Sequence, residues 1–471
     1  MAAGGGEDGP LDDDAERYRP LPTGSHGLDP ELVKLDQRER LRKAMIELIA
    51  AKGYPAVRIL DLAKLAHVSQ PTFYNLFRDK EDLFLSAYDE IAQQTGRTAL
   101  AAYAGEGAQD ERLRAAMRAF AELAVSEPTA MSLLMLGAFG AGARALEQRR
   151  RMLATLEARI LASRDGGPAR GDADLIVKAV LGGIREVTAE RLRSGRVDEL
   201  PRLVDELAAW AASYPRRIPD GLATPAITRR EPRSGRASER ARAAEGRLPS
   251  GRSDMPRQFI VKRQRERIVD ATAAIVAEKG LAALTIPEIA RRANVSNQTF
   301  YSIYGSKDEA FLGAQKIGMH QALGVAVAAY GAAGSDWPRA VAAGLRALID
   351  FLASEPVYAH LVLVDTFAAN PQAIAIRNES MRAFASYLHP GHALAGTPGA
   401  VPAIAEEAVV GGIWQVLHHY VENECIDQLS QAAPQLTYMA LTPFIGPQAA
   451  ADVAREATAE APATGSTLAS G

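Results

Sequence analysis

The sequence predicts an all-α protein that contains two tandem copies of one helical domain. Apolar residues recur at the spacing of a helix face, as at Leu41, Met45, Leu48 and Ile49, and alternation with a period of two residues is almost absent. A segment that begins at position 68 recurs in similar form 227 residues later, at position 295. Between the copies lies a stretch rich in Pro, Gly, Ser and Arg without an apolar face, which is typical of a linker.

The repeat is longer than one short motif. Residues 38–87 and 265–314 align without a gap and share 20 of 50 positions. Weaker matches follow in the same order, with Ser-Glu-Pro at 126 and 354 and Gly-Gly-Ile at 182 and 411. A whole domain is therefore duplicated. Two copies of about 185 residues do not make a solenoid, which needs three or more short repeats.

The clearest elements are two short helices in copy two. Thr285 is a good N-cap residue, and Glu288 three positions later completes a capping box. Asn294 tolerates left-handed backbone angles and ends this helix, and Ser296 caps the next one. Phe300 in that second helix points into the core, opposite a polar face. This is the pattern of a helix-turn-helix, whose second helix fits the DNA major groove.

Copy one departs from this pattern at two positions. Arg58 replaces the N-cap threonine, and an arginine cannot cap a helix, although it could reach a phosphate. Pro71 falls in the first turn of the second helix, where a missing N–H costs little. These departures leave open that only one copy has a working DNA-binding head, in which case copy one is a scaffold.

The repeated sequences, VSQPTFYNLFRDKEDLF at 68–84 and VSNQTFYSIYGSKDEAF at 295–311, resemble the DNA-binding domain of the tetracycline-repressor (TetR) family of bacterial transcription regulators. The resemblance implies double-stranded DNA, an operator, as the partner of each copy, and repression as the default outcome. It also implies that the helical segment after each motif encloses a pocket for a small-molecule effector, whose identity stays unknown.

The repeat and the resemblance together predict the order of domains. We expect a disordered acidic N-terminus (1–30), a first helix-turn-helix domain (31–90), a first helical regulatory domain (91–214), a basic Pro/Gly/Arg linker (215–256), a second helix-turn-helix domain (257–317), a second helical regulatory domain (318–446) and a flexible tail (447–471).

The resemblance assigns DNA contacts position by position. It implies a phosphate or base-edge contact for one threonine per copy, a phosphate contact for one tyrosine, and a phosphate contact for a lysine at the start of the next helix. These residues are Thr72, Tyr74 and Lys80 in copy one and Thr299, Tyr301 and Lys307 in copy two. The expected base-facing residues are Gln70, Asn75, Asn297, Gln298 and Ser302, and Arg58 and Thr285 stand at the start of the preceding helix.

Charge is unevenly distributed along the chain. Residues 1–31 contain eight acids and two arginines, whereas residues 215–267 contain fifteen Lys/Arg and six acids. A basic segment of this kind favours a polyanionic partner, although a solvated spacer has the same composition. A DNA-packaging protein that binds any sequence is therefore an alternative function, and weak, salt-dependent affinity without a preferred site would favour it.

Several residues could line an effector pocket in the helical bodies. Methionine and aromatic side chains suit an adaptable apolar pocket, although ordinary core packing uses the same residues. The candidates are Met131, Met135 and Met152 in copy one and His360, Phe367, Trp414 and His418 in copy two.

Duplication suggests that one chain supplies both halves of a dimer. The TetR resemblance implies a homodimer through the last two helices, and a flexible linker of about 42 residues spans roughly 35–40 Å, enough to let the copies pair within one chain. Gly182-Gly183 and Gly411-Gly412 suit a close helix crossing there, since each glycine costs a helix about 1 kcal/mol relative to alanine. A homodimer of two-headed chains is the alternative.

Other functions receive no support from the sequence. We find no phosphate-binding glycine loop, no nucleophile elbow and no metal-spaced His/Cys set, so we expect no enzyme activity, cofactor or metal. The one cysteine, Cys425, excludes an intrachain disulfide. The acidic N-terminus does not resemble a signal peptide, and the longest apolar stretch, near 131–143, is too short for a membrane span. We therefore expect a cytoplasmic protein without a membrane partner.

Overall fold

The computed structural model describes residues 29–163, 171–215, 219, 222, 257–366, 370–396 and 399–459. Helices and turns account for these residues, and no strand occurs among them, so the all-α prediction is confirmed. The expected disordered N-terminus up to residue 28, most of the linker and the end of the tail lie outside the described residues.

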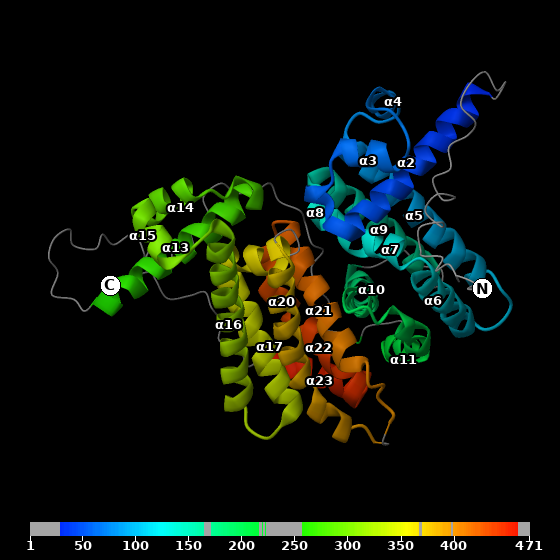
Figure 1. Cartoon of the computed structure of the whole chain (residues 1–471). Helices are drawn as coiled ribbons and strands as arrows, with labels where there is room; N and C mark the ends of the chain where they lie inside the picture. The colour runs from blue at the N-terminus through cyan, green and yellow to red at the C-terminus, as the bar shows by residue number, and fades with distance from the viewer. Residues whose placement is uncertain are drawn as a thin grey trace, which may run out of the picture. The chain divides into compact units, whose positions relative to one another are not determined.

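The chain divides into two compact units. Unit 1 comprises residues 1–155 and 191–201, and its head contains the first three helices (Figure 1). Its elements are α2 (Pro30–Lys52), η1 (Tyr54–Ala56), α3 (Ile59–Leu65), α4 (Gln70–Leu76), α5 (Lys80–Tyr103), α6 (Gln109–Ser126), α7 (Pro128–Ser132), the π-helical η2 (Leu133–Gly137), α8 (Ala138–Ala141), the larger part of α9 (Ala143–Ser163) and η3 (Val197–Glu199).

Unit 2 comprises residues 156–190 and 202–471, so it takes in two helices of copy one, α10 (Gly171–Arg193) and most of α11 (Leu200–Ala212). Its other elements are α13 (Arg257–Lys279), η4 (Leu281–Ala283), α14 (Ile286–Ala293), α15 (Asn297–Ile303), α16 (Lys307–Ala332), α17 (Trp337–Ser354), α18 (Pro356–His360), η5 (Leu361–Asp365), α20 (Pro371–Ser386), η6 (His389–Ala393), α21 (Ala405–Glu422), η7 (Ile426–Ala432), α22 (Ala433–Ile445) and α23 (Pro447–Ala459).

The sequence explains how each head begins and ends its helices. Gly53 and Gly280 end α2 and α13 at φ of 75° and 76°, values that favour glycine, and each amide donates 2.8 Å to the carbonyl four residues earlier. Phe73 and Phe300 are fully buried in the two heads, as their apolar character predicts. The basic run before residue 267 is the start of helix α13.

Each head, which is the helix-turn-helix domain of one copy, continues through one unbroken helix into its body, which is the helical regulatory domain that follows. α5 crosses the expected domain boundary at residue 90, and α16 crosses the one at residue 317. Figure 1 shows α13, α14 and α15 at one end of α16. A movement of the body can therefore reach the head without passing through a flexible joint.

The expected flexible tail is wrong for its first part. Residues 447–459 form α23, which packs on α17 and α22. Ala450, Ala451 and Ala454 are fully buried, because these small side chains repeat at helix spacing and let α23 approach closely. The alanines of residues 447–459 thus make a packing face where a flexible tail was expected.

The two glycine pairs meet inside unit 2. A Cβ on Gly182 would lie 2.5 Å from the Cβ of Gln415, and one on Gly412 would lie 2.7 Å from the carbonyl oxygen of Ala179. A Cβ on Gly183 would strike the carbonyl of Ala408. Copy one's α10 and copy two's α21 thus cross at backbone contact, which only glycine permits.

Polar contacts flank this crossing, which we call the glycine seam. The fully buried Arg377 donates two hydrogen bonds of 2.7 and 2.8 Å to the Glu186 carboxylate, and Asn378 donates to Glu190. Tyr214, which follows α11, donates its hydroxyl to the carbonyl of Met439 in α22. The seam therefore joins α10 and the end of α11 to α20, α21 and α22.

Among the described residues, no single helix has the length and apolar character to cross a membrane. Two sharply bent helix pairs, at 110–141 and 337–365, have that length and apolar character only when the two helices of each pair are counted together.

Candidate nucleic-acid interface

The turn of each helix-turn-helix is set by one residue with left-handed backbone angles. Asn294 has φ 50° and ψ 51°, as its amide side chain predicts, and His67 takes φ 51° at the matching position of copy one. Ser69 and Ser296 then cap α4 and α15, each accepting a hydrogen bond from the backbone N–H three residues later. The cap predicted at Ser296 is confirmed, and Ser69 makes the same cap at the matching position of copy one.

The capping box expected at Thr285 does not form. Thr285 stands at the N-cap position, but its side chain makes no capping hydrogen bond. Glu288 accepts from Lys279 and Arg291 instead, and the Arg291 hydrogen bonds are the main reason that its pKa falls to about 2. The stronger charged partners outcompete the backbone N–H for this carboxylate.

The two recognition helices present the same hydroxyl arrangement. The hydroxyls of Thr72 and Thr299 lie 2.7 and 2.9 Å from those of Ser69 and Ser296, and both threonines are half-buried. The neighbouring tyrosines project outward, with Tyr74 57% and Tyr301 58% exposed. Phenol groups this exposed are free to meet a phosphate.

Most of the other candidate residues also reach the surface. Arg58, Gln70, Asn75, Thr285, Asn297, Gln298 and Ser302 are all exposed. Within each head the structure therefore gathers these polar side chains around one short helix, on the side opposite the buried Phe73 or Phe300. Ser302 donates its hydroxyl to the carbonyl of Thr299, which leaves its lone pairs to accept from a base.

The two lysines have structural partners that the sequence did not indicate. The Lys80 ammonium donates to the carbonyls of Tyr54 (3.0 Å) and Val57 (2.9 Å), and burial lowers its pKa. Lys307 donates to the carbonyl of Leu284, which matches Val57 in the repeat. Both lysines tie the start of the next helix to the loop before the helix-turn-helix.

Sequence reasoning missed a pair of arginines that support the turn. Arg40 in α2 donates to the carbonyls of Ala66 and His67, and Arg267 in α13 donates to that of Asn294 at 3.2 Å. The two arginines occupy matching positions of the repeat. Their identity in both copies was a readable signal, but only the structure shows that their targets are the left-handed turns.

Comparison with known families decides what these heads are. The model of the bacterial regulatory proteins of the tetR family matches residues 41–87 and again residues 268–313.

The chain carries two tandem DNA-binding domains of the tetR family.

It is accordingly a transcription regulator with helix-turn-helix DNA-binding domains. One similar solved structure is the fatty acid degradation regulator FadR from Bacillus halodurans, at 16% identity and a TM-score of 0.34, covering 38% of this chain and 94% of that one. Another is a TetR-like transcriptional regulator from Rhodococcus sp. RHA1, at 22% identity and a TM-score of 0.31, covering 38% and 96%. No curated protein matches the chain.

The TetR-like body of copy two contains a cavity of about 100 Å³ with an almost wholly apolar lining. Of the seven candidate pocket residues, Trp414 lines it, together with Val362, Tyr330 and Tyr387. The indole nitrogen of Trp414 is buried and has no hydrogen-bond acceptor among the described residues. Trp414 thus brings a buried, unpaired N–H group to the wall of an apolar cavity.

The other pocket candidates do not line this cavity. His360 pairs with Asp365 at 2.8 Å, His418 lies 3.6 Å from Glu422, and Phe367 is outside the described residues. Met131 and Met135 are buried in unit 1, and Met152 is half-buried there. A second groove of about 960 Å³, lined by both charged and apolar side chains, lies in unit 2 where α13 meets α16 and α20.

Proposed function

We propose that this TetR-family protein is a ligand-responsive repressor that uses both heads of one chain, as an intrachain pseudo-dimer, on a single operator. The glycine seam is the observation that carries this proposal. It pairs the last long helices of copy one with those of copy two, the surface through which the family resemblance implies a homodimer. That surface is then already occupied within the chain, which argues against the alternative of two-headed homodimers.

Two unlike heads would read an operator with two unlike halves. Their recognition helices carry QPTFYN at 70–75 and NQTFYS at 297–302. Asn and Gln side chains can pair with adenine in the major groove, so the positions that differ face bases while the shared Thr-Phe-Tyr positions face backbone or core. We expect an asymmetric or quasi-palindromic site whose halves lie about one helical turn, roughly 34 Å, apart.

The cavity beside Trp414 is our candidate for the effector site. At about 100 Å³ it is smaller than most ligand pockets, which run to roughly 300–1,000 Å³, so an effector must displace lining side chains. The Arg377 guanidinium lies 4.6 Å from the centre of the Trp414 ring and binds Glu186 across the seam. Displacing Trp414 would therefore disturb the contact that joins the two copies.

The proposal is tested by footprinting the full-length chain, at a stated salt concentration, on DNA selected for binding. Tyr74→Phe and Tyr301→Phe each remove one exposed hydroxyl and keep the ring. Each should weaken binding by roughly 5–30-fold, the effect of about 1–2 kcal/mol for a hydrogen bond to a phosphate. Tyr103→Phe, at the far end of α5, is the matched control and should bind as wild type does.

The pattern of losses separates the alternatives. Two protected half-sites, with both head variants impaired, support the proposal. Loss only with Tyr301→Phe would mean that copy one is a scaffold. Protection without a discrete site would favour an architectural protein that binds any DNA.

A further inference from the structure

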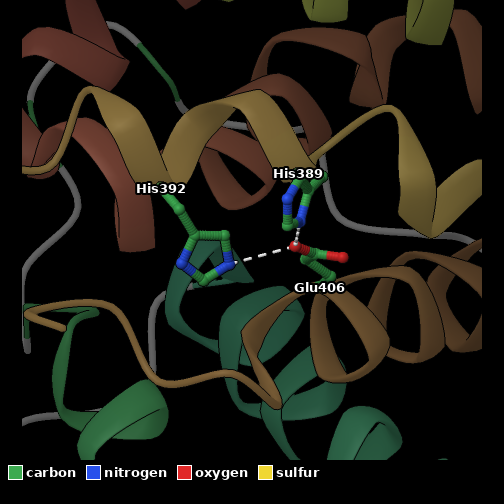
Figure 2. Close-up of side chains that lie close together, drawn as sticks. All are labelled: His389, His392 and Glu406. Atoms are coloured by element: carbon green, nitrogen blue, oxygen red, sulfur yellow. Dashed lines mark hydrogen bonds and ion pairs between the residues drawn. The ribbon is translucent and has the colours of Figure 1, made fainter. Parts of the chain in front are cut away.

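Two histidines and a glutamate converge on one point in unit 2. His389 Nδ1 lies 2.9 Å and His392 Nε2 lies 3.0 Å from the same carboxylate oxygen, Oε1 of Glu406. The potential ligand atoms of all three residues lie within 4.8 Å of one another. Figure 2 shows both imidazole rings joined by dashed lines to the same oxygen of Glu406. Nothing in the DNA-binding function calls for this cluster.

Local structure explains why the two histidines face the same way. His389 and His392 lie in η6, a 3₁₀ helix, and side chains three residues apart eclipse one another in a helix with three residues per turn. Glu406 lies in the first turn of α21, the next helix along the chain. The His-x-x-His spacing runs against the expectation that the chain has no metal-spaced histidine set, whereas the carboxylate comes from a different element.

The cluster stands on a rigid support. A Cβ on Gly391 would lie 2.5 Å from Trp337 and 2.7 Å from Phe444, so the backbone of η6 is pressed against α17 and α22. The His392 ring packs edge-on against Phe444 with centroids 5.5 Å apart. His392 and Glu406 are half-buried, whereas His389 is 78% exposed.

This donor set is that of a zinc site with an open position. Zinc takes imidazole nitrogen and carboxylate oxygen at about 2.0–2.2 Å in a tetrahedron, which places neighbouring ligand atoms about 3.3 Å apart. The two nitrogen–oxygen distances therefore need to open by only a few tenths of an ångström. An imidazole nitrogen coordinates a metal only without its proton, so metal binding releases any proton that these nitrogens carry.

We propose that His389, His392 and Glu406 bind one divalent transition-metal ion, with zinc as the best match and water in the fourth position. The ion fastens η6 to the start of α21, the helix that also carries Trp414 and the glycine seam. Nickel and copper share a preference for imidazole, so the selectivity among these ions is a measured outcome and not part of the assignment.

The test is a zinc titration of the full-length chain, prepared without a polyhistidine tag and stripped with a chelator, against a competing indicator. We expect one zinc per chain and a higher melting temperature with zinc. His389→Ala should weaken binding by at least about tenfold, since even loss of an outer-shell partner costs 10–100-fold. Glu406→Gln, which keeps the size of the side chain, should do the same.

His320→Ala is the control, because this exposed histidine on α16 lies outside the cluster. It should bind zinc as wild type does. The assignment is overturned if wild type binds only at millimolar zinc, or if His389→Ala keeps the wild-type stoichiometry and affinity. His389 is mostly exposed, so its replacement leaves the fold intact. The titration contains no DNA, and its failure would leave the proposed function untouched.

Discussion

At the scale of single residues, each of the two heads is stabilised internally by the same short set of contacts. Lys52 pairs with Asp61 in copy one, and Lys279 pairs with Glu288 at the matching positions of copy two. These ion pairs tie each first helix to the helix before the turn. The hydrogen bond from Lys52 lowers the pKa of Asp61, as those from Arg291 and Lys279 do for Glu288.

The lowered pKa of Glu288 predicts a pH-dependent contribution to stability. Its pKa is about 2 in the folded chain against an ordinary 4.5, so the contribution is present above about pH 4.5 and is lost as the pH falls toward 2. Glu288→Gln should lower the urea midpoint at pH 7, and the difference from wild type should shrink as the pH drops below 4.5. An equal difference at both ends of that range would contradict this assignment.

Single residues also show the limit of reading the sequence. Asn294, Ser296 and Phe300 behave as predicted, because a left-handed turn residue, a cap and an apolar ring depend on neighbours a few positions away. The capping box expected at Thr285 does not form, and Lys80 has protein partners that the sequence did not indicate, because these contacts are decided by residues farther away in the chain. Glu288 binds a lysine from α13, and Lys80 reaches carbonyls 23 and 26 residues away.

At the scale of elements, the glycine seam is the contact most sensitive to a small change. Gly183→Ala would push a methyl group into the Ala408 carbonyl and the Trp210 ring. Overpacking of this kind costs about 1–3 kcal/mol. We expect a lower denaturation midpoint for Gly183→Ala, measured by urea unfolding of the full-length chain.

Gly324→Ala is the matched control for this change. Gly324 lies within α16, and a Cβ there meets nothing within 4 Å. Alanine in an open helical position stabilises by up to about 1 kcal/mol. Gly324→Ala should thus unfold at the wild-type midpoint or later. If both variants unfold alike, the close approach at the seam is wrong.

Elements differ in how far the sequence predicts them. The helix-turn-helix can be predicted from the sequence because its capping, turn and core residues lie close together in the chain and occur in both copies. The α23 helix is not, because its alanines make a packing face only when α17 and α22 supply the other side. The metal-binding cluster needs η6 and α21 to meet, which no spacing in the sequence indicates.

At the scale of the whole molecule, the ion pair between Arg377 and Glu186 links the two copies. Arg377 is fully buried, and its removal would leave Glu186 without its bidentate partner. Breaking one side of a buried pair costs about 3–5 kcal/mol. Arg377→Met should lower the free energy of unfolding by that amount, and the double variant with Glu186→Gln should recover part of it. Strict additivity in this cycle would show that the pair does not couple the copies.

The duplication predicted the contact between the two copies inside unit 2 better than it predicted the domain boundaries. Gly182-Gly183 and Gly411-Gly412 were expected at an internal seam, and the structure brings them together in unit 2. The boundary expected at residue 214 does not separate the copies, since α10 and most of α11 pack with copy two. Domain boundaries placed along the sequence do not predict that α10 and α11 of copy one pack into the unit formed by copy two.

The central claim, that one chain is its own dimer on DNA, is tested most directly by the mass of the complex. The full-length chain and a duplex containing its footprinted site should be weighed together by sedimentation or mass photometry, across a range of protein concentrations. We predict one chain free in solution and one chain per operator with both half-sites occupied. A free dimer, or two chains on one operator, would contradict the account.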